Sequence, residues 1–283
     1  MDALTAMGQR CLRALGVLLL CWSGALLAQP LRAELAGATQ ALDRARIAEL
    51  AGGTRSLTVL EPHEDRERSY VGASMQSLLQ ALYGDAWRRA GAVQFECADG
   101  YRALVDPARL VAHPALLAWE SGDGAPFTLR NRTQNDELVT LGPYYLVWDN
   151  LAAPEVRARG ASDWPYQVVG IALVEVDTLL PKVLPPEGAD AAVQRGFAAF
   201  RSHCLTCHSI NGQGGAKAPE LNYPASVTEY LAPGWLRRWI LEPTAIRHAT
   251  TMPGLPPELP GREAVAADIE RYLQAMAAHK QRP

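Results

Sequence analysis

This chain has few cysteines and only a small excess of charge of one sign. Its 283 residues include only 5 cysteines, and two of them, Cys11 and Cys21, fall in the first stretch of the sequence. So few cysteines exclude a scaffold built on disulfides. The formal net charge of -3 leaves no excess of basic residues for binding nucleic acid. The chain also has no acidic tail of the kind that indicates disorder. The length suffices for two domains of ordinary size.

The N-terminal residues have the composition of an export signal. Arg10 and Arg13 precede an uncharged, mainly apolar run over residues 14–28. A basic start followed by a short apolar run is typical of a secretory signal. We therefore predict a signal peptide over residues 1–28 and a periplasmic protein. The uncharged run continues to Leu31, so an uncleaved anchor is the alternative, and membrane association is expected only in that case.

Residues 29–180 show mixed strand and helix patterns, which predict an α+β domain. Leucines at loosely helical spacing favour a surface helix over residues 31–50. Val93, Phe95 and Cys97 alternate with polar residues, as in a half-buried strand, and the Asp99-Gly100 turn follows. The other predicted elements are a helix over 74–83, a helix entered at Asp106-Pro107, and strands over 102–105, 144–148 and 167–176.

The segment 181–188 (PKVLPPEG) is rich in proline, which predicts a stiff linker between separately packed units. From residue 189 to 283 the pattern becomes helical, with helices expected around 191–202, 226–240 and 262–278. The chain is thus predicted to hold an all-α domain after the α+β domain.

The strongest chemical signal is Cys204-Leu205-Thr206-Cys207-His208. Two thiols three residues apart on a helical turn face the same side and can add to the two vinyl groups of one porphyrin, which places His208 under the iron as an axial ligand. A zinc half-site is one alternative, but no second Cys/His pair follows. A redox dithiol is another, but it should open a helix after a strand, whereas this motif ends a helix. The motif predicts one covalent haem c.

Around this motif, residues 191–278 resemble a class I c-type cytochrome. The family pattern has Gly196 and Phe200 before the motif, and a glycine-rich loop leading to Pro219 after it. The resemblance implies an all-α cytochrome c fold. It also implies that the carbonyl of Pro219 accepts the second ring N–H of His208, and that Phe200 packs against Tyr272 where the first and last helices cross. Electron transfer of this kind needs no catalytic residue.

Thr251-Met252-Pro253-Gly254 resembles the distal methionine segment of that family, which implies Met252 as the second axial ligand of the iron. Met276 and Met75 share the residue type, but Met276 is expected in the core of the last helix and Met75 lies in the other domain. His248 is the rival ligand, because a bis-histidine iron would need it.

Three aromatic residues and one histidine complete the expectations for this region. Tyr230, Trp235 and Trp239 are expected to add apolar bulk to the haem pocket. His203, which stands directly beside Cys204, is expected to be an exposed helix histidine.

Residues 56–176 resemble the molybdopterin-binding domain of sulfite-oxidase-like enzymes. The matching features are Ser77-Leu78-Leu79, the run 93–101 with its Asp-Gly-Tyr turn, Leu116-Leu117-Ala118, and Leu141-Gly142-Pro143. The resemblance implies a mixed sheet and a cysteine ligand for molybdenum.

A cysteine suited to hold molybdenum is missing from this domain. The family's ligand generally lies upstream of the matching stretch, and residues 53–92 contain no cysteine. Cys97 is the remaining candidate, but it is expected to be buried beside Val93 and Phe95. The cluster Arg66, Arg68, Arg88 and Arg89 offers either a pterin phosphate site or a solvated face. We therefore expect no molybdopterin.

The sequence as a whole predicts an exported carrier of single electrons, with an N-terminal domain that is degenerate or docks a partner. Its partners would be redox proteins, one donor and one acceptor. The alternative function is a sulfite-dehydrogenase-like enzyme in which Cys97 holds molybdenum and a haem removes the electrons.

Overall fold

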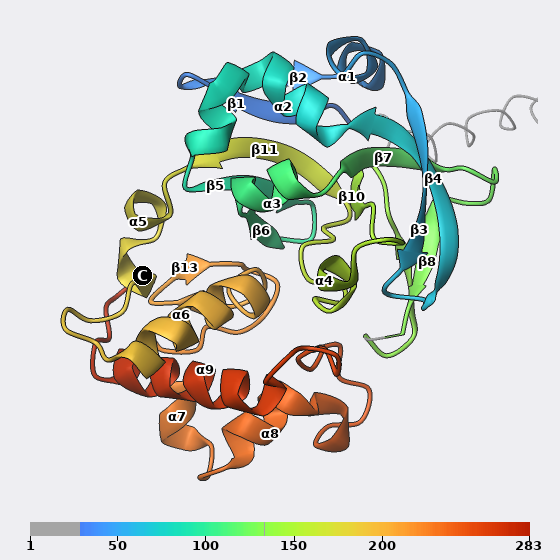
Figure 1. Ribbon diagram of the computed structural model, residues 1–283. Helices are drawn as coiled ribbons and strands as arrows, with labels where there is room; N and C mark the ends of the chain where they lie inside the picture. The colour runs from blue at the N-terminus through green and yellow to red at the C-terminus, as the bar shows by residue number, and fades with distance from the viewer. Residues whose placement is uncertain (1–28, 133) are drawn as a thin grey trace, which may run out of the picture.

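The structure, a computed structural model, describes residues 29–132 and 134–283, so the predicted signal peptide lies outside the described residues. A sheet-rich region extends to about residue 180, and a helical region follows it (Figure 1). Within the described part of the chain, no helix is long and apolar enough to cross a membrane.

Two sheets form the frame of the N-terminal region. The first has the strand order β2-β1-β11-β5-β6 and the second the order β10-β7-β4-β3. Among the strands that the structure describes, only β1 and β11 pair in parallel, so the first sheet is mixed. The strands are β1 Leu31–Leu35, β2 Ala38–Leu42, β3 Arg55–Glu61, β4 Arg66–Ser74, β5 Ala92–Cys97, β6 Arg102–Val105, β7 Ala115–Ser121, β10 Tyr145–Trp148 and β11 Val168–Val174, with a separate pair β8 Thr128–Asn131 and β9 Glu137–Thr140.

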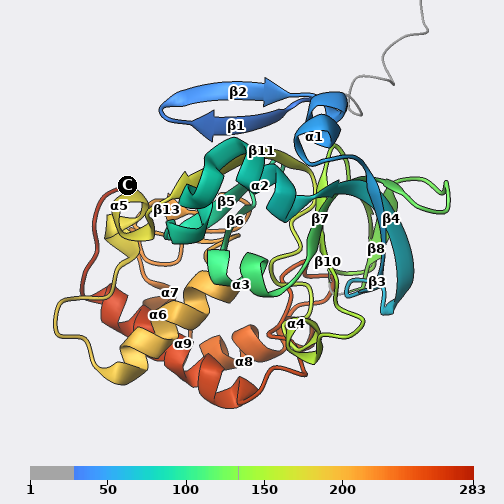
Figure 2. The same ribbon diagram turned by 45° about the horizontal axis from the view of Figure 1, so that its top comes forward.

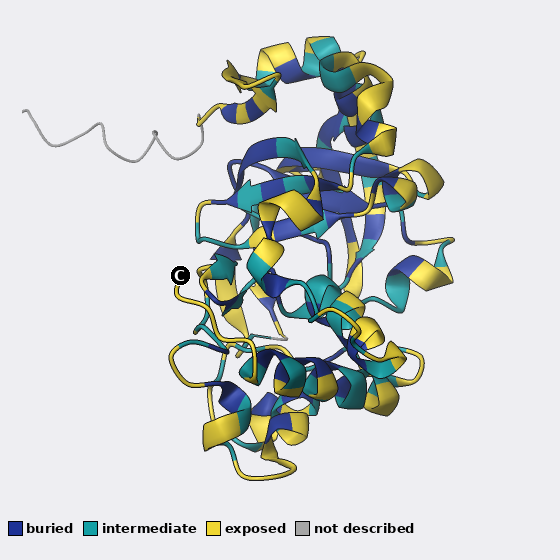
Figure 3. Cartoon of the chain, turned by 90° about the vertical axis from the view of Figure 1, so that its left-hand side faces the viewer, coloured by how far each residue is buried: buried dark blue, intermediate teal, exposed yellow. Residues whose placement is uncertain are grey.

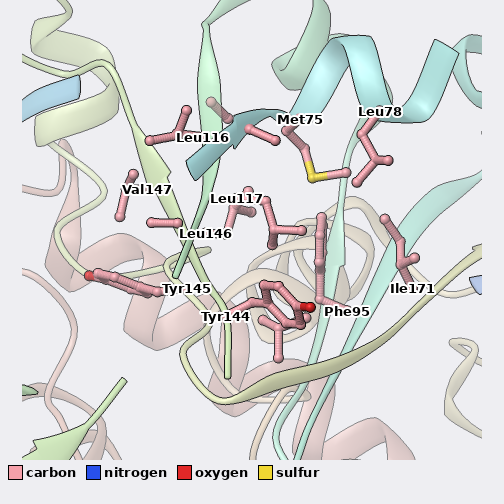
Figure 4. Close-up of a cluster of buried hydrophobic side chains, with 14 of the residues drawn as sticks. Met75, Leu78, Phe95, Leu116, Leu117, Tyr144, Tyr145, Leu146, Val147 and Ile171 are labelled. Atoms are coloured by element: carbon pink, nitrogen blue, oxygen red, sulfur yellow. The ribbon is translucent and has the colours of Figure 1, made fainter. Parts of the chain in front are cut away.

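Apolar side chains from both sheets and from α2 (Met75–Tyr83) meet in one core (Figure 4). Phe95 of β5, Leu117 of β7 and Tyr144, just before β10, are completely buried there. The predicted short helix is confirmed: the Ser74 side chain accepts from the backbone N–H of Ser77 at 3.3 Å, and the chain leaves at Gly84 with φ 56°. The remaining helices of the region are α1 Arg44–Leu50, η2 Gly84–Arg89, α3 Pro107–Ala112, α4 Pro154–Arg157 and α5 Val176–Leu179.

The helix predicted over residues 31–50 is wrong for its first half. β1 and β2 form a hairpin at the top of the molecule (Figure 2), turning at Ala36 and Gly37, which both have positive φ. Leu31 and Ala33 are completely buried while Arg32 and Glu34 are exposed. Burial therefore repeats every two residues, as in a strand, and not every 3.6 residues, as in a helix. Only the stretch 44–50 is helical.

In the helical region, α6 (Ala191–His203) crosses α9 (Arg262–Ala277). The helix predicted over residues 226–240 is two helices, α7 (Val227–Tyr230) and α8 (Trp235–Leu241). Pro233 and Gly234 interrupt the predicted helix, and Gly234 has a positive φ of 81°. The remaining elements are η4 Pro243–Ala245 and a small hairpin of β12 Ser209–Ile210 and β13 Gln213–Gly214.

The proline-rich segment does not stand free as a spacer. Residues Pro181–Val183 form the short helix η3, and Val183 is completely buried in the core of the helical region. Its carbonyl accepts a hydrogen bond of 2.6 Å from the hydroxyl of Tyr272. Ala92 and Val176 of the sheet-rich region belong to the same core. The helical core therefore includes buried residues from both regions, and buried stretches appear in each region in Figure 3.

Candidate functional site

The Cys204–His208 segment continues from the end of α6 as one more turn. Asp190 caps the start of α6 by accepting from the backbone N–H of Val193 at 2.8 Å. After the helix ends, the N–H groups of Cys207 and His208 donate to the carbonyl of Cys204 at 3.1 and 2.9 Å. This helical spacing brings the two thiols and the imidazole to one side of the chain.

Both thiols are free of disulfides and partly buried. Burial raises the pKa of Cys204 to about 12. Burial also raises the pKa of Cys207, although Lys217 acts against it. At neutral pH the two groups are therefore protonated, whereas a dithiol built for disulfide exchange needs a thiolate. Their setting disfavours the redox-dithiol alternative.

His208 is held by the carbonyl of Pro219, which lies 2.7 Å from its Nδ1 atom. A carbonyl only accepts, so Nδ1 carries the proton and Nε2 presents its lone pair. Burial lowers the pKa of His208, which keeps the imidazole neutral. A neutral imidazole with a fixed tautomer is the form that binds iron. This is the contact that the family resemblance implies.

The loop between His208 and Pro219 depends on glycine. Gly215 donates its N–H to the carbonyls of Leu205 and His208 at 2.8 and 3.1 Å. A Cβ atom on Gly215 would overlap the carbonyl of Thr206, and one on Gly214 would overlap that of His208. Only a residue without a side chain lets this loop lie directly against the Cys204–His208 turn.

Glu220 is a functional residue that the sequence reading missed. Its carboxylate accepts from the backbone N–H groups of Asn211, Gly212 and Asn222 at 2.8 to 2.9 Å. Burial alone would raise the pKa of Glu220, but hydrogen bonds from the Ser209 side chain and from the backbone of Gly212 and Asn222 lower it. The ionised side chain thus ties together both ends of the loop that holds Pro219. An acidic residue directly after that proline was the available signal.

The crossing of α6 and α9 fixes the position of α6, whose end continues into the Cys204–His208 turn. A Cβ on Gly196 would overlap the backbone carbonyl of Asp268, so the helices touch there. The rings of Phe200 and Tyr272 stand 5.1 Å apart, and both are completely buried. Arg195 and Asp268 close the crossing with an ion pair of 2.7 Å.

Met252 lies in an irregular segment that α8 anchors. Leu255 donates its N–H to the carbonyl of Ile240 at 3.0 Å, and Gly254 packs on the carbonyl of Leu241. Met252 is partly exposed, and its N–H donates to the hydroxyl of Thr250 at 3.2 Å. The rival His248 is exposed.

The two other methionines are core residues, as expected. Met276 is 1% exposed within the helical core and Met75 is completely buried in the other region.

Two expectations for individual residues need correction, and one stays a prediction. Tyr230 and Trp235 are 59% and 41% exposed, with Arg238 stacked on Trp235, and their place beside a haem stays a prediction. His203 is not an exposed helix histidine: its Nδ1 lies 3.1 Å from the hydroxyl of Ser162, and burial lowers its pKa to about 4. Arg68 is also buried, where it donates to the carbonyl of Thr128 at 2.8 Å.

The cysteine-bearing turn packs against the sheet-rich region. Arg102 donates its N–H to the carbonyl of Thr206 at 3.0 Å, and Ala216 donates to that of Gly100 at 3.3 Å. Lys217 pairs with Asp99 at 2.5 Å. The Asp-Gly-Tyr turn of the N-terminal region therefore reaches the residues that flank Cys207.

Cys97 is 4% exposed inside β5, and burial raises its pKa well above the ordinary value. Among the described residues, no three His, Cys, Asp or Glu side chains gather as a metal site. Cys97 lies on the apolar face of a strand, whereas a molybdenum ligand needs a place on an accessible loop.

The residues present do suit a haem c. Two thiols on one turn, an imidazole with its tautomer fixed and a thioether on the irregular segment after α8 are the donor set of such a group. Residues 193–275 match the family model described as Cytochrome c, which is less than a third of the chain. The C-terminal region is therefore a cytochrome c domain, a domain that carries electrons on haem. The comparison with curated proteins gives no match.

Proposed function

We propose that this chain is an exported carrier of single electrons with one haem c, attached through Cys204 and Cys207 and ligated by His208 and Met252. The observation that carries the proposal is the 2.7 Å contact between His208 Nδ1 and the Pro219 carbonyl. It fixes the imidazole directly beside two thiols on the same turn. A dithiol has no use for a fixed imidazole, and a zinc site needs further ligands that the described residues do not gather there.

The haem supplies one-electron exchange at its iron, and the chain's residues prepare the place for it. Pro219 holds the ring of His208, and Glu220 holds the loop around Pro219. The thioether of Met252 favours ferrous iron, so this ligand raises the reduction potential. Phe200 and Tyr272 exclude water behind the turn, since both are completely buried. No acid, base or nucleophile is required.

For the sheet-rich region we propose a role in docking a redox partner. Two observations support this role. Cys97 is a buried neutral thiol, which argues against a metal site in this region. The Asp99–Gly100 turn packs against the residues beside Cys207, which brings the region close to the haem attachment turn. A partner bound to this region would lie close to the haem attachment site. Its binding would be weak, as is usual for electron-transfer pairs.

The attachment is tested on a denaturing gel. Haem held by thioether bonds stays with the polypeptide, so the wild-type band should stain for haem. Cys204→Ala combined with Cys207→Ala should lose the stain, whereas the control Cys97→Ala should keep it. A wild-type band without haem stain would refute the proposal.

The ligation is tested with Met252→Ala. We expect loss of the weak sulfur-to-iron band at the red end of the oxidised spectrum and a lower reduction potential, because the ligand favouring ferrous iron is gone. His248→Ala is the matched control and should change neither property. A wild-type spectrum without that band, together with a spectrum and potential that change in His248→Ala but not in Met252→Ala, would assign the ligand to His248.

A further inference from the structure

A buried cluster with unbalanced charge lies where the two regions meet. Arg109 of α3 and Arg159, which follows α4, both pair with the same atom, Oδ2 of Asp163; for Arg159 the distance is 2.9 Å. The side chains of Arg109 and Asp163 are 10% and 6% exposed. Trp148 covers the cluster from one side, with the guanidinium of Arg109 4.3 Å from the centre of its ring.

One carboxylate cannot neutralise two guanidinium groups. Arginine does not lose its proton in proteins, so the cluster retains one positive charge. His203, which is close enough to feel the charges of Arg159 and Asp163, adds no compensating charge: its Nδ1 contacts the neutral hydroxyl of Ser162, and its imidazole is uncharged at neutral pH. Water screens part of this charge at Arg159, which is 34% exposed, but Arg109 is 10% exposed and shares its one carboxylate partner with Arg159.

The unmet hydrogen bonds of the cluster have one chemical character. Arg109 Nη2, Arg159 Nε and Trp164 Nε1 are buried, and none has a partner among the described residues. All three are donors. The two arginine atoms each belong to a planar guanidinium whose other nitrogen contacts Oδ2 of Asp163. Buried donors without acceptors are rare in folded proteins.

We propose that this cluster is an anion site, which takes the carboxylate or oxyanion of a small ligand between Arg109 and Arg159. Such a group supplies the missing negative charge and can accept from two guanidinium forks at once. The site joins the segment 158–164 to the end of α6, and His203 directly precedes Cys204. A bound anion would therefore hold the two regions together at the haem attachment turn.

Two sources can supply this chemistry, namely a free oxyanion from solution or a carboxylate of the haem itself. Inorganic phosphate is the probe for the first source, with sodium chloride at matched ionic strength as the reference. The full haem-loaded protein is heated in a calorimeter over a phosphate series. We expect the melting temperature to rise by about 2–4 °C for each tenfold increase in phosphate above the dissociation constant.

Arg109→Lys is the decisive variant, because lysine keeps the charge next to Asp163 but lacks the second nitrogen. Arg159→Lys makes the same change at a side chain that is 34% exposed and is safer for folding. Arg46→Gln, which breaks an exposed ion pair with Glu49, is the control. A phosphate effect lost in both lysine variants and kept in the control supports a free oxyanion.

If phosphate has no effect, the second source is read from the haem carboxylate bands in the resonance Raman spectrum. A shift of these bands in Arg109→Lys, without one in Arg46→Gln, supports a haem carboxylate in the site. The proposal is overturned if phosphate acts equally on all variants, or if neither phosphate nor the lysine substitution has any effect. The phosphate series is informative even for protein that carries no haem, so it fails independently of the proposed function.

Discussion

At the scale of single residues, burial separates thiols that look equivalent in the sequence. Cys204 and Cys207 occupy a loop-facing turn next to a histidine with a fixed tautomer, whereas Cys97 sits on the apolar face of a central strand. All three have raised pKa values because of burial. Their roles are therefore assigned by neighbouring groups and not by thiol acidity.

The first prediction concerns Cys97. Cys97→Ala removes one buried sulfur from the core beside Val93 and Phe95, and should cost about 1–2 kcal/mol of unfolding free energy. Haem content and reducibility should be unchanged. The measurements are urea unfolding and elemental analysis of protein made in a molybdenum-replete host. Molybdenum near one atom per wild-type chain, absent from the variant, would instead support the two-cofactor enzyme.

A second residue-scale feature is the carboxylate of Glu61, which is completely buried. Tyr70 donates to it at 2.6 Å, Tyr145 at 3.0 Å, and His63 Nδ1 lies 2.7 Å away. Burial would raise the pKa of Glu61, but the hydrogen bonds and the charge of this network lower it below 4.5. The carboxylate is thus ionised in the folded protein and organises three neighbouring side chains.

The pH dependence of stability follows from this lowered pKa. A carboxyl group with a depressed folded pKa contributes stability above its unfolded pKa and loses that contribution as pH falls through the folded value. Glu61→Gln should cost about 1–3 kcal/mol at pH 7 and should flatten the loss of stability below pH 4.5. Urea unfolding from pH 3 to about 7 measures both effects. Glu67→Gln, exposed at the start of β4, should change neither, and an unaltered acid limb in Glu61→Gln would contradict the assignment.

At the scale of elements, the contact between α6 and α9 positions the haem turn. The helices approach so closely at Gly196 that a side chain there meets the Asp268 carbonyl. Phe200, one turn further on, packs on Tyr272, and the Cys204–His208 turn follows directly. A displacement of α6 would therefore move the thiols and His208 together.

Gly196→Ala should force the two helices apart. We expect a loss of about 1–3 kcal/mol in unfolding free energy, because an added methyl in a packed contact causes strain. The better helix propensity of alanine offsets only part of that loss. Ala198→Val, which adds bulk on the exposed face of α6, is the control and should cost less than about 0.7 kcal/mol. A Gly196→Ala variant as stable as the wild type would show that the helices do not touch as described.

At the scale of the whole molecule, the two regions share buried surface. The helical core includes Ala92 and Val176 from the sheet-rich region and Val183 from the proline-rich segment. Hydrogen bonds from Arg102 and Ala216 join the facing loops. Such contacts couple the regions energetically, in contrast to domains joined by a free linker.

This coupling predicts one cooperative unfolding transition. Urea titrations followed by far-ultraviolet circular dichroism, which reports on both regions, and by haem absorbance, which reports on the helical region, should give the same midpoint. Lys217→Ala, which removes the ion pair with Asp99, should shift both curves together. Two separate midpoints in the wild type would show that the regions unfold independently.

Sequence patterns alone determined the features that depend on neighbours in the chain. The haem motif, the cap of α2 by Ser74, and the alternation of β5 are local, because a turn, a cap or a strand face is set by residues within a few positions. The same holds for the interruption that Pro233 and Gly234 impose between α7 and α8, although the predicted single helix overlooked it.

Only the tertiary structure decided what distant segments do to one another. The partly buried setting of His203, the packing of Val183 and the pairing of Arg109 with Asp163 each arise from segments tens of residues apart. The hairpin over residues 31–42 is also tertiary in origin: β1 gains a parallel partner in β11, and that pairing overrides a weak helical pattern. Burial and charge pairing depend on contacts between distant segments of the folded chain, so they cannot be predicted from one segment in isolation.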